Sequence, residues 1–108
     1  MMIVTTEQIP GRHIVKALGF VQGSSIRARH IGRDLLAAFK NITGGEITEY
    51  TKLMAEAREQ ALDRMREQAA ALGGDAVVCV RFVTTEVMEN AAELVAYGTA
   101  VVTEEAAE

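Results

Sequence analysis

The chain has 108 residues, of which 49% are hydrophobic and 24% charged, and its formal net charge at pH 7 is -4. This length and composition predict one ordinary domain with a real core, and the acidic balance argues against nonspecific nucleic-acid binding. With no basic apolar leader and no run of about 18 apolar residues, we expect no membrane segment and a cytoplasmic location.

Two strands and a short helix are predicted in the first part of the chain. Residues 2–5 are a short strand candidate, and a Pro-Gly turn at 9–12 separates them from a second strand at 13–22 that is rich in β-branched residues. The sequence Gly23-Ser24-Ser25 is expected to end this strand. Apolar residues then recur at steps of four, three and four, which predicts an amphipathic helix at about 32–41.

A long helix is predicted at 46–72, between the pairs Gly44-Gly45 and Gly73-Gly74. Thr43 and Glu46 have the spacing of a capping box, and Gly73 is well placed as the left-handed residue that stops the helix. The apolar residues of this segment form one stripe at helical spacing, and most charged residues fall on the other side. The stripe consists of Ile47, Tyr50, Met54, Ala57, Ala61, Met65, Ala69 and Leu72.

Two further strands are predicted at 76–85 and 93–103 and are expected to form a β-hairpin. The last strand is apolar on both faces, which is typical of a central strand with both faces covered. We therefore expect it between the strands at 13–22 and 76–85, with the three strands mutually antiparallel, in a split β-α-β arrangement with right-handed crossover. Residues 1–103 are predicted to form the single domain, and 104–108 a short acidic tail.

The dimensions of these elements predict self-assembly. A helix of this length spans about 40 Å and strands of ten residues about 33 Å, so both reach the full width of a domain of this size. One face of the sheet is then left uncovered. We expect another copy of the chain to cover it in a symmetric homo-oligomer.

Short sequence motifs spread over nearly the whole chain carry a family resemblance. They include Gly44-Gly45-Glu46, Tyr50-Thr51, Ala57-Arg58, Arg64-Met65, Leu72-Gly73, Asp75-Ala76-Val77-Val78, Val80-Arg81-Phe82 and Ala96-Tyr97-Gly98-Thr99-Ala100-Val101. With these motifs the chain resembles the bacterial YbjQ family. The resemblance implies a dodecin-like α+β subunit that assembles as a ring, a pentamer, without a characterised activity. The expected subunit has a mainly antiparallel sheet of three to four strands, with one short and one long helix on one face.

The same family carries a heavy-metal-binding label, which the sequence supports weakly. Cys79 is the only cysteine, so paired thiolate ligands and an intramolecular disulfide are excluded. His13 and His30 are far apart, and no Cys-x-x-Cys or His-x-x-x-His motif is present. We therefore predict no metal site and no cofactor; a site that joins copies of His30 in a ring is the alternative.

A cluster of arginines is the best candidate for a binding site. Arg27, Arg29 and Arg33 could hold phosphate or carboxylate groups through bidentate hydrogen bonds. The Gly44-Gly45 turn before the long helix could likewise hold an anion, but the carboxylate of Glu46, as a capping residue, would then already occupy this positive end. The alternative is charge pairing, since residues 1–45 hold six basic and two acidic residues, and 46–108 hold five basic and thirteen acidic ones.

Arg81 interrupts an apolar strand and needs a partner or an exit to water. Glu93 and Asp34 are the expected partners, and Tyr97 has a hydroxyl that would also seek a bond. Arg81, Glu93 and Tyr97 are therefore predicted either to form a satisfied buried network or to line a pocket.

No nucleophile elbow, phosphate-binding loop or dinucleotide motif is present in the sequence, so we do not expect an enzyme. Three functions remain open. The first is a ligand- or anion-binding module on a homo-oligomeric ring, for a small molecule of unknown identity; the others are a structural ring and a metal-binding protein.

Overall fold

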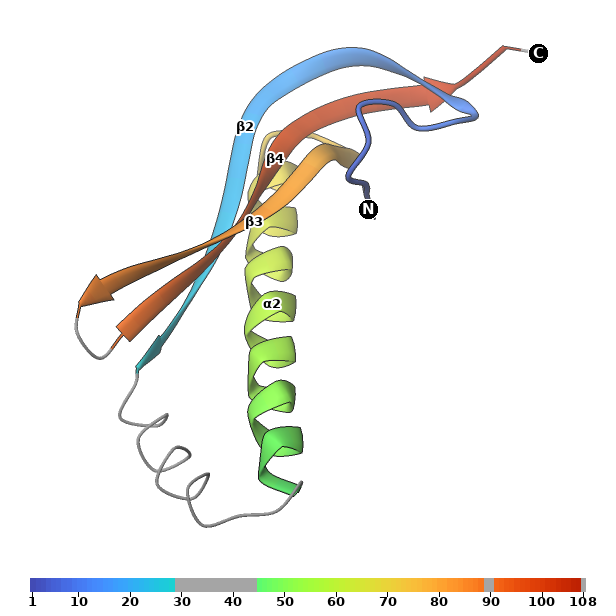
Figure 1. Ribbon diagram of the computed structural model, residues 1–108. Helices are drawn as coiled ribbons and strands as arrows, with labels where there is room; N and C mark the ends of the chain where they lie inside the picture. Colours follow the sequence, from blue (N-terminus) through green and yellow to red (C-terminus); the bar gives the residue numbers. More distant parts are fainter. Residues whose placement is uncertain (29–44, 89–90, 108) are drawn as a thin grey trace.

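The fold is α+β, with one long helix packed on a four-stranded mixed sheet. The computed structural model describes residues 1–28, 45–88 and 91–107. Their elements are β1 (Met2–Ile3), β2 (Arg12–Ala28), α2 (Gly45–Ala71), β3 (Ala76–Met88) and β4 (Ala91–Glu105). Figure 1 shows α2 along one side of the sheet. The predicted short helix at 32–41 and Thr43 of the predicted capping box lie outside the described residues.

The strand order is β1-β3-β4-β2, which confirms the predicted central position of the last strand. β4 pairs antiparallel with both β2 and β3. The prediction that all three strands are mutually antiparallel was wrong, because two strands that are both antiparallel to the strand between them run parallel to each other. β1 pairs with β3 in parallel, which makes the sheet mixed. β4 also continues to Glu105, two residues beyond the predicted end of this strand.

The prediction that Gly23-Ser24-Ser25 ends the second strand was wrong, because β2 continues to Ala28. At Gly23 the backbone of α2 lies directly against the strand. A Cβ there would collide with the carbonyl oxygen of Ala61 and the backbone nitrogen of Met65. A glycine inside a strand can mark such a close approach instead of a strand end.

The long helix ends at Ala71, one residue before the predicted end at Leu72, and Gly73 is the left-handed stop that the sequence predicted. Gly73 has a φ of +90°, its nitrogen donates to the carbonyl oxygen of Ala70, and the nitrogen of Gly74 donates to that of Ala69, each at 2.9 Å. This is a Schellman cap. Ala57, Ala61, Met65 and Ala69 of the predicted stripe are completely buried. Leu72 is not part of the buried stripe, because it lies beyond the helix and is 48% exposed.

Both faces of the sheet carry buried residues, but the part of the chain that the structure describes covers only one end of the second face. On the first face, Val21, Val77, Ala96 and Ala100 pack against the buried residues of α2. On the second face, Ile9 and Val4 of the N-terminal segment pack against a cluster formed by the start of β3 and the adjoining part of β4. That cluster comprises Ala76, Val78 and Val101.

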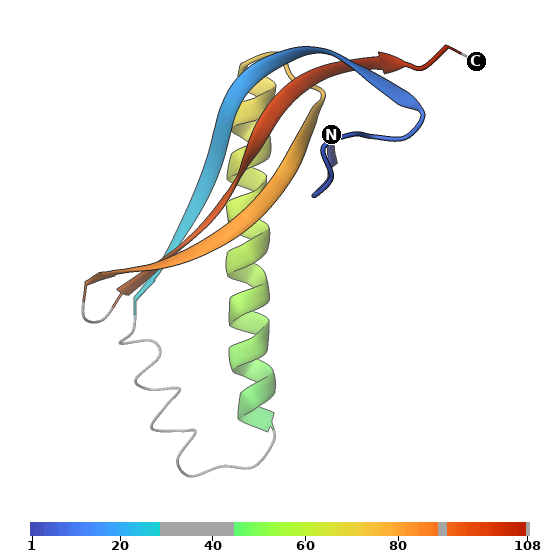
Figure 2. The same cartoon turned by 45° about the horizontal axis from the view of Figure 1, so that its top comes forward.

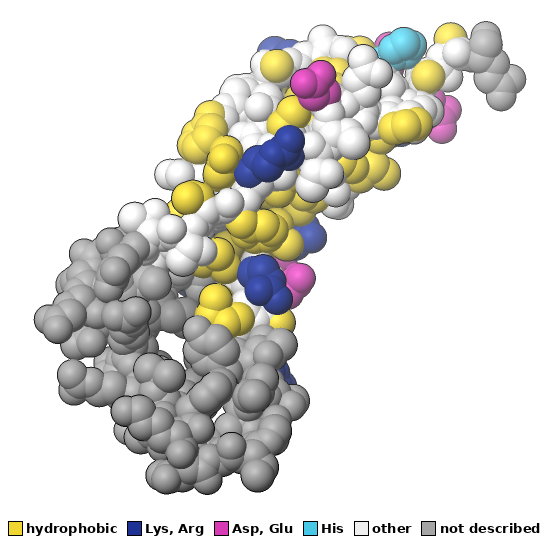
Figure 3. Space-filling model, in the orientation of Figure 1, with side chains coloured by type: hydrophobic (Ala, Val, Ile, Leu, Met, Phe, Trp, Pro, Cys, Tyr) yellow, Lys and Arg dark blue, Asp and Glu magenta, His cyan; other side chains and the backbone are white. Residues whose placement is uncertain are grey.

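Farther along, the second face has no covering element among the described residues, and we call this part the open face. It comprises Phe20 and Ile26 of β2, Val83 of β3, and Val95 and Tyr97 of β4. The strand register sets these residues on the side opposite Ala96 and Ala100. Phe20, Ile26 and Val83 are 63%, 58% and 45% exposed. Figure 3 shows hydrophobic side chains at the surface over the strands.

The molecule is elongated. Its radius of gyration is 17.5 Å and its extents are 59 × 27 × 17 Å, whereas a compact domain of this length has a radius of gyration of about 13 Å. Figure 2 shows β2 and β4 curving past the end of α2 toward the C-terminus. In this shape, much of the sheet has no covering layer among residues 1–28, 45–88 and 91–107. No helix of the described residues is long and apolar enough to cross a membrane.

Candidate functional site

A polar network joins the beginning of β2, the end of β4 and the turn after α2. Asp75 accepts hydrogen bonds from the nitrogen of Thr103 at 2.9 Å and from its Oγ1 at 3.0 Å. Nε of Arg12 donates to Oγ1 of Thr103 at 2.7 Å, and Nη2 lies 3.7 Å from Oδ2 of Asp75. Thr103 is only 7% exposed, so these bonds satisfy an otherwise buried hydroxyl.

The Schellman cap places Asp75 at this position. The turn at Gly73 and Gly74 brings the chain back to β4, where the nitrogen of Asp75 donates to the carbonyl oxygen of Val101 at 3.0 Å. The carboxylate of Asp75 accepts from the amide of Thr103, two residues farther along β4. β3 begins at the next residue, Ala76. Sequence reasoning missed this network, because it joins residues 28 positions apart in the chain.

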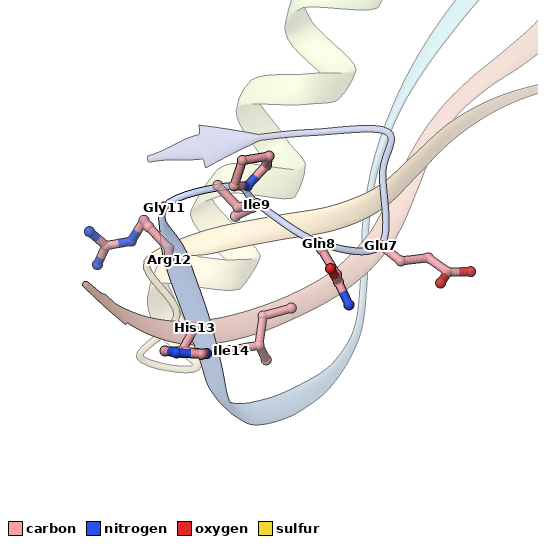
Figure 4. A pocket seen from close by; sticks show the side chains of 8 residues that line it. Glu7, Gln8, Ile9, Gly11, Arg12, His13 and Ile14 are labelled. Carbon is pink, nitrogen blue, oxygen red and sulfur yellow. The ribbon is translucent and has the colours of Figure 1, made fainter. Parts of the chain in front are cut away.

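A pocket of about 590 Å³ lies inside the N-terminal turn, lined by residues 7–14. Ile9 is 5% exposed, and its carbonyl oxygen accepts from the nitrogen of Arg12 at 3.0 Å. Figure 4 shows the side chains of Glu7 and Arg12 pointing to opposite sides of the turn. The pocket therefore combines an apolar part with a charged rim. The sequence predicted the turn but not the pocket.

The three residues predicted as a network or pocket lining are spread along the sheet. Arg81 and Tyr97 lie directly opposite each other in the register of β3 and β4, whereas Glu93 lies opposite Thr85, four residues from Tyr97. Arg81 is exposed. Its Nη1 donates to the carbonyl oxygens of Thr5 and Val80, each at 2.9 Å. The expected bond to Glu93 is thus replaced by bonds to backbone carbonyls, and Arg81 ties the N-terminal segment to β3.

Cys79 lies at a bulge of β3, where the register shifts between Val78 and Arg81. Its φ is +57°, a left-handed value that is uncommon outside glycine. Its nitrogen donates to the carbonyl oxygen of Thr6 at 3.0 Å, so the bulge helps to hold the N-terminal segment. The thiol is half-buried.

The described residues of one chain do not fit a heavy-metal site. Among them, no three His, Cys, Asp or Glu side chains come close enough together to hold an ion. Cys79 offers one soft ligand, and sites for soft metals need several. His30, the other predicted contributor, lies outside the described residues.

The predicted anion site falls mostly on residues that the structure does not describe. Arg27 belongs to the last part of β2, where its backbone lies opposite Ala92. Gly45 is the first residue of α2. Arg29, Arg33 and Gly44 lie outside the described residues.

Comparison with known proteins gives relatives over almost the whole chain. Residues 1–104 match a family model, YbjQ_1, described as "putative heavy-metal-binding". A UPF0145 protein from Hahella chejuensis is 55% identical over 96% of this chain and 100% of its own length. One from the archaeon Thermococcus kodakarensis is 56% identical over 96% of this chain and 92% of its own length.

A solved structure has a similar fold. It is a crystal structure of a protein with unknown function of the DUF74 family from Pediococcus pentosaceus, with a TM-score of 0.63 and 18% sequence identity. The match covers 96% of this chain and 98% of that one. At this identity the likeness concerns the fold alone.

Proposed function

Since the chain belongs to the YbjQ family of UPF0145 proteins, we propose that it is a homo-oligomeric binding protein, not an enzyme, in which another copy covers the open face. The family spans both bacteria and archaea. Its "putative heavy-metal-binding" description is a family-level label and names no residues.

The observation that carries this proposal is the exposure of Phe20, Ile26 and Val83 on one face of the sheet. Complete burial of a side chain of this size is worth about 1.5–3 kcal/mol. Covering three that are roughly half exposed gains several kcal/mol, which is a useful contribution toward association. The radius of gyration of 17.5 Å also supports association with a second copy. A flat subunit buries much apolar surface when a second layer packs on its sheet.

The finer features of the proposal follow the family resemblance. The parallel pair β2 and β3 with β4 between them supports a dodecin-like split β-α-β subunit. We place five such subunits in a ring, in the cytoplasm.

Light scattering behind a sizing column tests the assembly. The wild-type protein at micromolar concentration is expected to have the mass of several chains, and five is the specific expectation. Phe20→Lys should reduce this mass, whereas Leu72→Lys, a control of similar exposure off the open face, should not. A stable mass of one chain for the wild type would overturn the proposal.

We place the ligand site of this module on Arg27, Arg29, Arg33, Gly44 and Gly45. Support comes from the excess of basic residues in the first 45 positions and from the start of α2 at Gly45, where backbone amides favour anions. In a thermal-shift experiment, phosphate should raise the melting temperature of the wild type. Arg27→Ala should abolish the shift, and Arg58→Ala on the exposed side of α2 should keep it. An equal shift in all three proteins would exclude this site.

Metal binding is the second candidate, favoured by the family description. It requires ligands from outside the described residues or from several copies of the chain. Elemental analysis of protein purified without an affinity tag separates the two candidates. A stoichiometric transition metal would favour the metal site over the anion site.

A further inference from the structure

Phe20 is an exposed aromatic side chain that is held in place by its neighbour. It is 63% exposed, the largest exposed fraction among the large hydrophobic residues described. Its ring centroid lies 6.1 Å from that of Tyr97, with an angle of 33° between the ring planes. Such ordered aromatic side chains often anchor protein interfaces by entering a pocket on the partner.

The pocket inside the N-terminal turn is suited to receive an apolar anchor. Ile9, Pro10 and Ile14 supply its apolar part, and its volume of about 590 Å³ can hold an aromatic ring. The turn is also held rigidly. Ala106 donates to the carbonyl oxygen of Gly11 at 3.0 Å, and Arg12 is bound to Thr103. A preformed pocket costs little ordering entropy on binding.

The two surfaces offer one pair of opposite charges, Arg81 beside the anchor and Glu7 at the rim of the pocket, where Arg12 is already bound to Thr103 and lies near Asp75. Arg81 lies opposite Tyr97, on the same face as Phe20, and its guanidinium donates to the neutral carbonyl oxygens of Thr5 and Val80. Glu7 is an exposed carboxylate at the rim of the pocket. When an aromatic ring enters the pocket, a cation beside that ring can approach this carboxylate.

Phe20 cannot enter the pocket of its own chain. Ile14 and Phe20 are six residues apart on the same strand, and an extended strand separates such residues by roughly 20 Å. The ring must therefore belong to a second copy of the chain.

We propose that Phe20 of one copy enters the pocket of residues 7–14 in the next copy, with Arg81 of the first facing Glu7 of the second. This inference rests on the homo-oligomer proposed above and assigns its two contacting surfaces. Because the anchor and the pocket are different surfaces, the contact is heterologous. Repeated contacts of this kind generate a ring if the rotation closes.

A mixing experiment tests the heterologous contact. Ile14→Lys blocks the pocket and leaves the anchor intact, whereas Phe20→Lys removes the anchor and leaves the pocket intact. Each variant alone should have the mass of one chain, with a dissociation constant raised about 30-fold or more. An equimolar mixture should form a complex of two chains, because one intact anchor and one intact pocket remain. A mixture that stays at the mass of one chain overturns the inference.

Charge reversal tests the same contact independently of the apolar residues. Arg81→Glu and Glu7→Arg should each raise the dissociation constant about fivefold or more, and the double variant should recover most of the loss. Additive losses in the double variant contradict the predicted pair. Val83→Lys provides a second open-face variant that checks the result of Phe20→Lys.

The outcomes also separate this inference from the proposal on which it rests. A wild-type protein with the mass of one chain rejects the assembly itself. A wild-type oligomer that Phe20→Lys dissociates but Ile14→Lys leaves intact rejects only the pocket as the partner surface.

Discussion

Asp75 and Thr103 are joined by two hydrogen bonds, from the nitrogen of Thr103 to Oδ1 at 2.9 Å and from its hydroxyl to Oδ2 at 3.0 Å. The carboxylate thus occupies a position on the edge of β4 that a neighbouring strand would otherwise fill. β3 begins one residue later, at Ala76. The contact therefore fixes the short connection between the end of α2 and the start of β3 to β4.

Replacing Asp75 by Ala should destabilise the protein by about 1–3 kcal/mol, because the amide and hydroxyl of Thr103 lose their acceptor. Since the carboxylate is 46% exposed, the lower half of this range is expected. Urea denaturation at fixed protein concentration measures the change. The control is Asp63→Ala, which removes an exposed ion pair with Arg66 and should cost less than about 0.5 kcal/mol. Equal losses for both variants would show that the Thr103 contact contributes nothing special.

Gly23→Ala should destabilise the protein by about 1–3 kcal/mol or more, because the new methyl group collides with the backbone of α2 at Ala61 and Met65. A helix backbone cannot yield as a flexible side chain can. Ser24→Ala is the matched control, since the bond that Arg64 donates goes to the backbone carbonyl of Ser24. Circular dichroism during thermal unfolding compares the two. A melting temperature for Gly23→Ala within a degree of the control would contradict the close approach.

Gly73→Ala should cost about 1 kcal/mol, because the Schellman cap requires a φ of +90° at this residue. Gly74→Ala tests the neighbouring position, where φ is not in the left-handed region. The nearest atoms to its added methyl group are 3.2–3.4 Å away, so small adjustments should accommodate it. Chemical denaturation should therefore rank Gly74→Ala as the more stable variant. The reverse order would mean that packing against Ala69 and Val101 matters more than the cap.

Ser25 and Gln60 should be energetically coupled. The completely buried hydroxyl of Ser25 donates to Oε1 of Gln60 at 2.8 Å and links β2 to α2. Ser25→Ala leaves the amide oxygen without this donor and should cost about 1–2 kcal/mol. A double-mutant cycle with Gln60→Ala should give a coupling energy of about 0.5 kcal/mol or more. Strictly additive losses would show that the bond contributes no net stability.

The positions of the long helix and of β4 could be predicted from sequence because each depends on a local pattern. The stripe at 57, 61, 65 and 69 has the helical period, and the double apolar face of β4 is typical of a central strand. The end of the helix at Gly73 could also be predicted from local sequence, since glycine readily adopts positive φ. These features belong to single segments.

The candidate site depends on contacts between segments, and here the predictions were less accurate. Arg81 bonds to Thr5, 76 residues away, and not to Glu93, because the bulge at Cys79 brings the N-terminal segment beside β3. Gly23 was predicted to end its strand because the residues next to it in sequence give no sign that α2 packs against it. The arginine cluster stays a prediction, since most of it lies outside the described residues.

The sequence alone was enough to predict the long helix, the approximate positions of the strands and the central position of β4, because periodicity and backbone preference act over a few residues. Only the tertiary structure decided that Arg12, Asp75 and Thr103 meet, that a pocket forms inside the N-terminal turn and that Phe20 lies exposed beside Tyr97. These relationships depend on register, bulges and the curvature of β2. Such features arise from the pairing of distant segments, so local sequence patterns do not encode them.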